Sequence, residues 1–408
     1  MSTISAFRAL RPRPSDAERI ASVPYDVVST EEARALAEDN PLSFLRVSRP
    51  EIELPDTTDP HADVVYERAA QNFETLKARS LVVEDEAAVY LYRLAMGGHV
   101  QIGVAGCFAL DEYDRGVIKK HERTRPDKED DRTRHMLTLR AQTGPVFLTY
   151  RAASNQDALR RTAERIVVEA PLFDFTAPDQ VRHTLWRVTG PDRDAIVSAF
   201  ARVPALYIAD GHHRAASAAR ARQALRKQDH PTNDGAETFL AVAFPDDQVQ
   251  ILPYNRIVKD LGGLSTAQFL EAVGQRFTAR RGPESPAVRG DIAMFFQGGW
   301  RTLRSKTPPD PSNAIQSLDV SLLQDQLLAP ILNVHDVRTD KRIEFIGGAR
   351  GIASLERAVN SGQAAVAFSL FPVSVSDLMA VSDAGEIMPP KSTWFEPKLR
   401  DGLLIHEI

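Results

Sequence analysis

An apolar run that leads directly into a glycine turn is the feature that most limits how this chain can fold. Residues 205–209 are typical of a buried strand, and Asp210-Gly211-His212-His213-Arg214 follows at once. An alanine-rich helix is expected over roughly 215–226. A strand, a glycine turn and a helix in immediate succession favour an α/β fold.

Other segments predict further helices and strands. Hydroxyl and acidic residues at 29–32 are the usual chemistry of a helix start, and a second amphipathic helix is expected from Val64 to Arg79. Apolar segments at 88–93 and 100–106 flank Gly97-Gly98 and predict a hairpin. We also expect a strand at 146–150, a short strand and turn at 23–28, a second strand pair at 238–244 and 249–254, and a loop at 308–312.

Composition excludes several classes of function. A chain of 408 residues is expected to form two or three packed units. Its net charge of -5 lacks the basic excess that sequence-independent nucleic-acid binding requires, so nucleic acid is a disfavoured partner. The single cysteine, Cys107, sits in an apolar run and is expected to be a buried thiol. No membrane span or secretory leader is apparent, so we expect a cytoplasmic protein.

The glycine turn is the strongest candidate for phosphate chemistry. Backbone amides at a helix start carry partial positive charge, and Gly211 permits close approach of an anion. His212, His213 and Arg214 add donors, and Asp210 could hold magnesium or orient a hydroxyl. The alternatives are a capped helix whose histidines bond to neighbouring backbone, and a catalytic zinc site.

Two other segments carry residues suited to the same chemistry. In His121-Glu122-Arg123-Thr124, Glu122 could act as general base toward a substrate hydroxyl. The alternative is a solvated charged segment, because charges are dense from Lys119 to Arg132, after which a helix is expected. In Lys391-Ser392-Thr393 a lysine and two hydroxyls could bind phosphate or carboxylate, and turn capping is the alternative. Neither a glycine-rich phosphate loop nor a dinucleotide fingerprint is present.

These motifs carry a resemblance to a known superfamily. The strand ending in Asp210-Gly211-His212-His213-Arg214 resembles the ParB and sulfiredoxin-like superfamily, and most of all its free-serine kinase branch. Lys120-His121-Glu122 resembles the kinase segment that supplies the catalytic glutamate. Pro390-Lys391-Ser392-Thr393 and Pro397-Lys398 resemble its terminal substrate-binding loop. The three segments follow one another in the same order as in the kinase.

Over nearly its full length the chain resembles the family catalogued as domain of unknown function 1015. The segments that carry this resemblance are 7–12, 24–28 and 252–256. The two resemblances together imply an α/β protein with a ParB/sulfiredoxin-like core. We expect an N-terminal family-specific α/β region at 1–114, the nucleotide- and phosphate-binding core at 115–260, and a C-terminal α/β substrate lobe at 261–408, with the site between the last two.

The kinase resemblance implies a role for each candidate residue. Glu122 would be the general base, assisted by Asp210, which would also hold Mg²⁺. Nucleotide phosphates would bind at Gly211, His212, His213 and Arg214, and the acceptor at His121, Thr124, Lys391, Ser392 and Thr393. The donor would be ATP or ADP, and the acceptor free L-serine or a similar hydroxylated metabolite.

Two rival functions use the same phosphate-binding turn. One is a nucleotide-binding and hydrolysing regulator of the ParB type, and the other is a phosphoester hydrolase. Against the regulator, the chain has no helix-turn-helix candidate beside a basic patch, and the Glu122 region offers an apparent base. Dependence of nucleotide turnover on a small hydroxylated amino acid would separate the kinase from the regulator.

Overall fold

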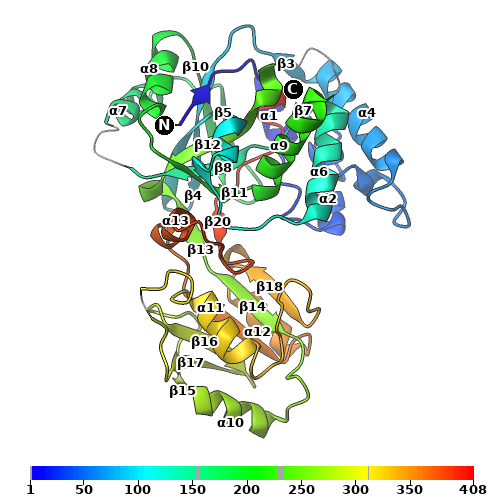
Figure 1. Ribbon diagram of the computed structural model, residues 1–408. Coiled ribbons are helices and arrows are strands. Elements are labelled where there is room, and N and C mark those ends of the chain that lie inside the picture. Colours follow the sequence, from blue (N-terminus) through cyan, green and yellow to red (C-terminus); the bar gives the residue numbers. More distant parts are fainter. Residues whose placement is uncertain (1, 153–156, 228–233, 311) are drawn as a thin grey trace. The chain divides into compact units, whose positions relative to one another are not determined.

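The computed structural model describes residues 2–152, 157–227, 234–310 and 312–408. The chain divides into two compact units. Unit 1 comprises Met1–Lys120, Thr124–Val249 and Pro397–Ile408, and unit 2 comprises His121–Arg123 and Gln250–Glu396. Each unit contains its own large β-sheet with helices around it, which confirms the expected α/β class (Figure 1).

A mixed sheet of nine strands forms the centre of unit 1. The pairs β11–β6 and β12–β8 are parallel and the other pairs are antiparallel. In spatial order the strands are β6 (Ile118–Lys119), β11 (Leu206–Asp210), β8 (Val146–Tyr150), β12 (Thr238–Pro245), β5 (His99–Ala109), β4 (Val89–Met96), β10 (Arg182–Val188) and β9 (Phe173–Thr176), and β1 (Ile4–Ser5) also pairs with β5.

The helices of unit 1 include α9, whose first turn carries three candidate site residues, and its neighbour α6. Helices α6 and α9 lie side by side (Figure 1). The helices are α1 (Ala17–Ile20), α2 (Thr30–Ala37), α3 (Leu45–Ser48), α4 (Asp63–Arg79), α5 (Leu110–Asp114), α6 (Pro126–Leu139), α7 (Asp157–Ile166), α8 (Gly190–Phe200) and α9 (His212–Arg226). Two short strand pairs complete the unit, β2 (Leu10–Pro12) with β3 (Leu81–Val83), and β7 (Ala141–Gln142) with β21 (His406–Glu407).

Several local predictions are confirmed. The hairpin of β4 and β5 is antiparallel from Tyr90 paired with Ala105 to Met96 paired with His99. Gly97 turns the chain there with a φ of 58°. Helix α2 begins after a Ser29 side chain that accepts a hydrogen bond from the Glu32 amide, as the hydroxyl and acidic residues predict.

The predicted domain boundaries do not coincide with the two units. Strands β4 and β5 fall in the predicted region 1–114, yet they belong to the same sheet as β8, β11 and β12 from the predicted core. The reason is the pairing of β5 with β12, which joins Thr238 to Ala109 and continues to Ala243 opposite Val104. Unit 1 also includes the last residues of the chain, from Pro397 onward.

The predicted strand pair at 238–244 and 249–254 is wrong. Strand β12 forms as expected, but it lies between β5 and β8, and the six residues Phe239 to Phe244 are buried. A 3-10 turn, η5 (Asp246–Gln248), then redirects the chain, and β13 (Gln250–Leu252) pairs with β20 (Trp394–Glu396) in unit 2. A strand that is buried along its length needs a neighbouring strand on each edge. Because β5 and β8 occupy both edges of β12, no edge is left for β13.

Two other expectations also need correction. The segment 23–28 forms the expected turn but no strand, because the extended backbone beside it makes only an isolated bridge between Ser22 and Asp401. The helix that we expected after the charged segment 119–132 begins within that segment, since α6 starts at Pro126. Proline suits the first turn of a helix. His135 and Met136 are buried and lie on the side of α6 that faces the protein interior.

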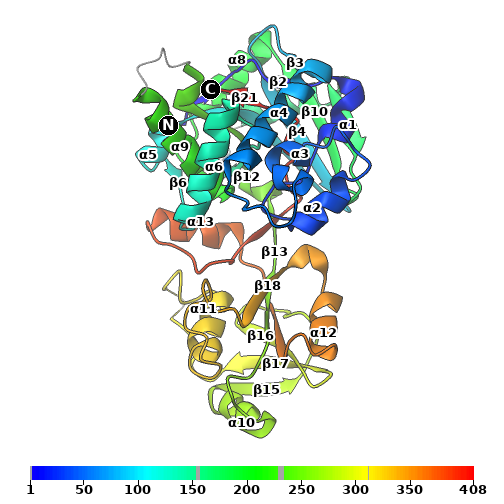
Figure 2. The same cartoon turned by 90° about the vertical axis from the view of Figure 1, so that its right-hand side faces the viewer.

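Six antiparallel strands form the sheet of unit 2. Figure 2 shows helices α11 and α12 on opposite faces of this sheet. The strands in spatial order are β15 (Phe277–Arg281), β17 (Gly299–Ser305), β16 (Asp291–Phe296), β19 (Val366–Leu370), β14 (Tyr254–Val258) and β18 (Ile343–Gly347). The helices are α10 (Thr266–Arg276), α11 (Asp319–Leu323), α12 (Ala353–Asn360) and α13 (Val375–Asp383).

Cys107 is buried in β5, as expected, and burial raises the pKa of its thiol, so it is protonated and unreactive at neutral pH. The segment 308–312 lies outside regular secondary structure over its described residues, and residue 311 lies outside them. Among the described helices, none combines the length and the apolar character needed to cross a bilayer.

The aromatic core beneath β5 predicts a large stability effect. Phe108 is fully buried, and its ring centroid lies 6.0 Å from that of Phe200 and 6.3 Å from that of Phe239. Phe108→Ala is expected to lower the free energy of unfolding by about 3–5 kcal/mol, because it removes apolar contacts and leaves a cavity. Urea unfolding followed by circular dichroism measures this. Val100→Ala, at an exposed position of the same strand, is the control, and an equal loss in both variants would contradict the prediction.

Candidate functional site

The glycine turn between β11 and α9 has the conformation that its sequence predicts. Gly211 adopts φ 92° and ψ 31°, in the left-handed region that glycine occupies without steric cost. A Cβ atom at this position would lie 2.9 Å from Nε of Arg214. Helix α9 starts at His212, one turn earlier than expected, so the two histidines and Arg214 lie in its first turn, where backbone amides point outward.

Asp210, at the end of β11, is held by two cations. Its Oδ2 lies 3.2 Å from Nζ of Lys398 and 3.5 Å from Nη2 of Arg214. Burial alone would raise the pKa of Asp210, but Lys398 and Arg214 outweigh this effect and hold its pKa well below the usual range. Asp210 is therefore a carboxylate at neutral pH.

Arg214 is buried beneath this turn. Its Nη1 donates to the carbonyl oxygen of Pro145, which precedes β8. The side chain is therefore fixed between the end of β11 and the segment that precedes β8. Burial tends to lower the pKa of Arg214, but Asp210, Asp26 and Asp401 reverse this and raise it, so the guanidinium is charged.

Two other predicted site residues make local contacts around the start of α6. The Arg125 amide donates to Nε2 of His213 at 3.1 Å, so this nitrogen carries a lone pair. The hydroxyl of Thr124 donates to a carboxylate oxygen of Glu129, in the first turn of α6. The contact between Arg125 and His213 ties the chain before α6 to the first turn of α9, and the contact between Thr124 and Glu129 caps the start of α6.

In unit 2, predicted substrate-binding residues gather around the loop before β20. His121 is buried, its Nε2 lies 3.4 Å from Oγ1 of Thr393, and its carbonyl oxygen accepts the Met388 amide at 2.8 Å. Ser392 is buried too, and its hydroxyl donates to the Pro389 carbonyl at 2.6 Å. The Ser392 contact is the turn-capping bond that the sequence left open as an alternative.

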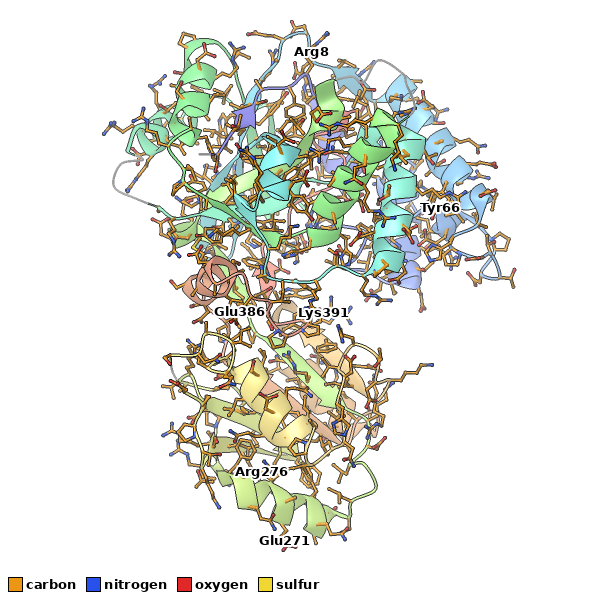
Figure 3. The ribbon with its side chains drawn as sticks, viewed as in Figure 1. Arg8, Tyr66, Glu271, Arg276, Glu386 and Lys391 are labelled. Carbon is orange, nitrogen blue, oxygen red and sulfur yellow. The ribbon has the colours of Figure 1, made fainter. Side chains whose placement is uncertain are left out.

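Lys391 is exposed at the tip of this loop and is labelled in Figure 3. It has a φ of 57°, a conformation that non-glycine residues seldom adopt. Its carbonyl oxygen accepts a hydrogen bond from Nη2 of Arg256 at 3.0 Å, and its Nζ lies 5.5 Å from the ring centroid of Tyr254. These two contacts attach the loop to strand β14.

The structure brings the candidate residues together in two groups. Asp210, Gly211, His212, His213, Arg214 and Thr124 belong to unit 1, whereas His121, the half-buried Glu122, Lys391, Ser392 and Thr393 belong to unit 2. Sequence reasoning did not include Lys398 or Arg256 among the site residues. Both lie in segments that carry the family resemblance, which was the available signal.

A small cavity of about 40 Å³ lies inside unit 1 beside Arg214. Arg132, Tyr25 and Asp401 are among its lining residues. Asp401 is only 2% exposed, and its Oδ1 has no hydrogen-bond partner within the part of the chain that the structure describes. Burial raises the pKa of Asp401 to about 7, and Asp26 adds to this, while Arg214, Arg132 and Arg400 oppose it.

Asp401 makes the stability of unit 1 depend on pH. In the unfolded chain the pKa of an aspartate is about 4. Between this pH and about pH 7, the folded state therefore retains on Asp401 a proton that the unfolded state releases. Stability contributed by this proton is therefore lost as pH rises. From pH 5 to pH 8, the free energy of unfolding of the wild type should fall by roughly 1 kcal/mol or more relative to that of Asp401→Asn, as measured by thermal unfolding at each pH. The control is Asp39→Asn at an exposed position, and parallel profiles for wild type and Asp401→Asn would refute the prediction.

Comparisons with known proteins show the family to which the chain belongs. Similar solved structures include SbnI with a C-terminal truncation from Staphylococcus aureus, with TM-score 0.39 and 14% identity over 74% of this chain and 87% of that chain. A free serine kinase in complex with AMP has TM-score 0.35 and 15% identity over 74% of this chain and 92% of that chain. A conserved hypothetical protein from Pyrococcus furiosus has TM-score 0.35 and 15% identity over 74% and 95%. No curated protein matches the sequence. The family model described as protein of unknown function (DUF1015) matches residues 4–321, and the chain therefore belongs to the DUF1015 family.

Proposed function

We propose that this protein is a small-molecule kinase that transfers a phosphoryl group from a nucleotide to the hydroxyl of free L-serine or a similar metabolite. The observation that carries the proposal is the turn from β11 through Gly211 to α9, where outward-facing amides meet Arg214 and Lys398. Such a turn binds phosphate because the amides and the cations all favour negative charge. The resemblance of Asp210–Arg214, Lys120–Glu122 and Pro390–Thr393 to free-serine kinases supports the same reaction.

The charges around Asp210 suit a nucleotide phosphate. A lone carboxylate at the start of α9 would repel a phosphate, but Lys398 and Arg214 both contact the Asp210 carboxylate and offset its charge. His212 and His213, in the first turn of the helix, add ring nitrogens beside the same amides. We propose that these groups hold the phosphates of ATP or ADP and stabilise the charge that develops during transfer.

The residues of unit 1 also fit a magnesium ion. Within the described residues, both close contacts of the Asp210 carboxylate involve Oδ2, so Oδ1 is the atom that would bind Mg²⁺. One carboxylate oxygen together with phosphate oxygens and water is the usual ligand set of this ion. When bound, Mg²⁺ would neutralise charge on the nucleotide phosphates.

Glu122 is the residue that we propose as general base. In the reaction the acceptor hydroxyl oxygen forms a bond to the terminal phosphorus, the bond from that phosphorus to the bridging oxygen breaks, and the nucleotide leaves with the electron pair. The hydroxyl proton passes to the Glu122 carboxylate, with Asp210 assisting. Phosphoryl transfer depends mainly on positioning and charge, which makes a single base sufficient.

The acceptor is proposed to bind at His121, Thr124, Lys391, Ser392 and Thr393. In unit 2, His121 and the loop before β20 are held in place by the contacts with Thr393 and Met388. A fixed loop presents the exposed Lys391 ammonium at low entropic cost. The acceptor would therefore carry a negative group besides its hydroxyl.

The kinase proposal is tested by phosphorus NMR. The purified full chain is incubated with Mg²⁺, L-serine and either ATP or ADP, and we expect O-phosphoserine to form from one of the two nucleotides. Glu122→Gln keeps the size of the side chain but removes the base, so the rate should fall by about a hundredfold or more. Glu271→Gln, at an exposed position of α10 (Figure 3), is the control and should leave the rate unchanged.

Other outcomes of this experiment separate the rival functions. Nucleotide hydrolysis that L-serine does not stimulate would replace the kinase by a nucleotide-dependent regulator. Phosphate release from a phosphoester without any nucleotide would replace it by a hydrolase. An unchanged rate in Glu122→Gln would remove this residue from the role of base.

The glycine turn makes a second prediction for nucleotide binding. In Gly211→Ala the new Cβ would press against Nε of Arg214, so we expect ADP affinity to fall about tenfold or more. Gly116→Ala is a matched control, because Gly116 also has a positive φ, of 73°, but a Cβ there meets no atom within 4 Å among the described residues. Isothermal titration calorimetry with ADP compares them. Equal affinities in the two variants would mean that the turn does not bind the nucleotide.

A further inference from the structure

Asp401 has a buried carboxyl group that makes no hydrogen bond to the residues that the structure describes. Its backbone is well bonded, since the Asp401 amide donates to the Ser22 carbonyl at 2.9 Å. Within the described part of unit 1, however, neither carboxyl oxygen accepts a hydrogen bond or joins an ion pair. A buried carboxyl group without such bonds is costly, because it has lost the hydrogen bonds that it makes to water in the unfolded chain.

The hydroxyl of Tyr25 is a second polar group of this kind. Tyr25 and Asp401 line the same cavity, of about 40 Å³. Burial raises the pKa of the Tyr25 phenol, and the guanidinium of Arg132 lies 4.3 Å from the centroid of its ring. Within the described residues, Tyr25 accepts a hydrogen bond from Arg49 through its backbone carbonyl, at 3.0 Å, but its hydroxyl makes none.

Ser48 supplies a third polar group to the cavity. It is buried, it is one of the lining residues, and its Oγ has no hydrogen-bond partner in the part of the chain that the structure describes. A buried water molecule needs roughly 10–15 Å³ of such space and about two to four polar partners. The cavity has the required volume, and three of its lining side chains have the required hydrogen-bonding groups.

The charges around the cavity favour a neutral molecule. Arg132 and Arg214 also line it and would repel a cation. Both arginines are already paired, because Nη2 of Arg132 lies 2.7 Å from Oδ2 of Asp131. Likewise, Nη2 of Arg214 lies 3.5 Å from Oδ2 of Asp210. An anion would therefore meet the Asp401 carboxylate beside cations that are already compensated. Water is neutral and can both donate and accept hydrogen bonds, as a carboxylate and hydroxyls require.

We propose that this cavity is a binding site for at least one structural water molecule, which donates a hydrogen bond to the Asp401 carboxylate and bonds to the hydroxyls of Tyr25 and Ser48. The water joins both ends of the chain, since Tyr25 and Ser48 belong to the N-terminal region and Asp401 to the last residues. It stabilises unit 1, because it satisfies polar groups that are buried on folding. The site does not depend on the kinase proposal.

A high-resolution crystal structure of the full chain tests the site directly. Crystals grown with sodium bromide in place of sodium chloride, and measured at the bromine absorption edge, distinguish a water from a halide. We expect an electron-density peak within hydrogen-bond distance of the Asp401 carboxylate and the Tyr25 hydroxyl, without an anomalous signal. An anomalous peak would mean that the site binds an anion, and either that result or the absence of any peak would overturn the proposal.

Two matched variants test the contribution of the water to stability. Tyr25→Phe removes one bond to the water, and we expect it to lower the midpoint of thermal unfolding by about 2–4 °C. Tyr90→Phe is the control, because the Tyr90 hydroxyl in β4 is also buried without a partner among the described residues but does not line this cavity. Removal of an unpaired buried hydroxyl should keep or raise the midpoint.

Equal midpoints in Tyr25→Phe and Tyr90→Phe would overturn the proposal. The electron density is measured in the wild type, so the proposal remains testable even if Tyr25→Phe does not fold.

Discussion

The ion pair between Asp210 and Lys398 is the contact on which the rest of unit 1 depends. It joins the end of β11 to the C-terminal segment 397–408, which also pairs with the N-terminal region through Leu10 and Ile405. Without Lys398, the carboxylate at the glycine turn would lose its closest cation, at a cost that burial makes large. The last residues of the chain are therefore part of the phosphate-binding turn that we propose.

The two units differ in the groups that contact their buried arginines. Arg214 in unit 1 forms an ion pair with Asp210, and the charges of Asp26 and Asp401 also raise its pKa, so its charge is compensated in the free protein. Arg256 in unit 2, as far as the structure describes that unit, contacts the carbonyl oxygens of Tyr254 and Lys391 and the ring of Phe345.

Local patterns predicted most elements well, and long-range pairing was the main source of error. The β4–β5 hairpin, α4 and the strand, glycine and helix at 206–226 depend on residues close together in the sequence, so periodicity and turn chemistry sufficed. Strands β12 and β13 are also adjacent in the sequence, but they pair with β5 and β8 and with β20, respectively. Sequence proximity is a weak guide where a buried strand needs two neighbours.

The sequence by itself determined the α/β class, the family and the residues of the glycine turn, because these follow from short motifs and from the alternation of apolar segments. Only the tertiary structure decided the charge state of each group. The sequence does not reveal the pKa of Asp210, Asp401 or Arg256, yet on folding the pKa of Asp210 falls, that of Asp401 rises to about 7, and that of Arg256 falls to about 10. Their pKa values depend on burial and on partners such as Lys398, which come from distant parts of the chain and meet only on folding.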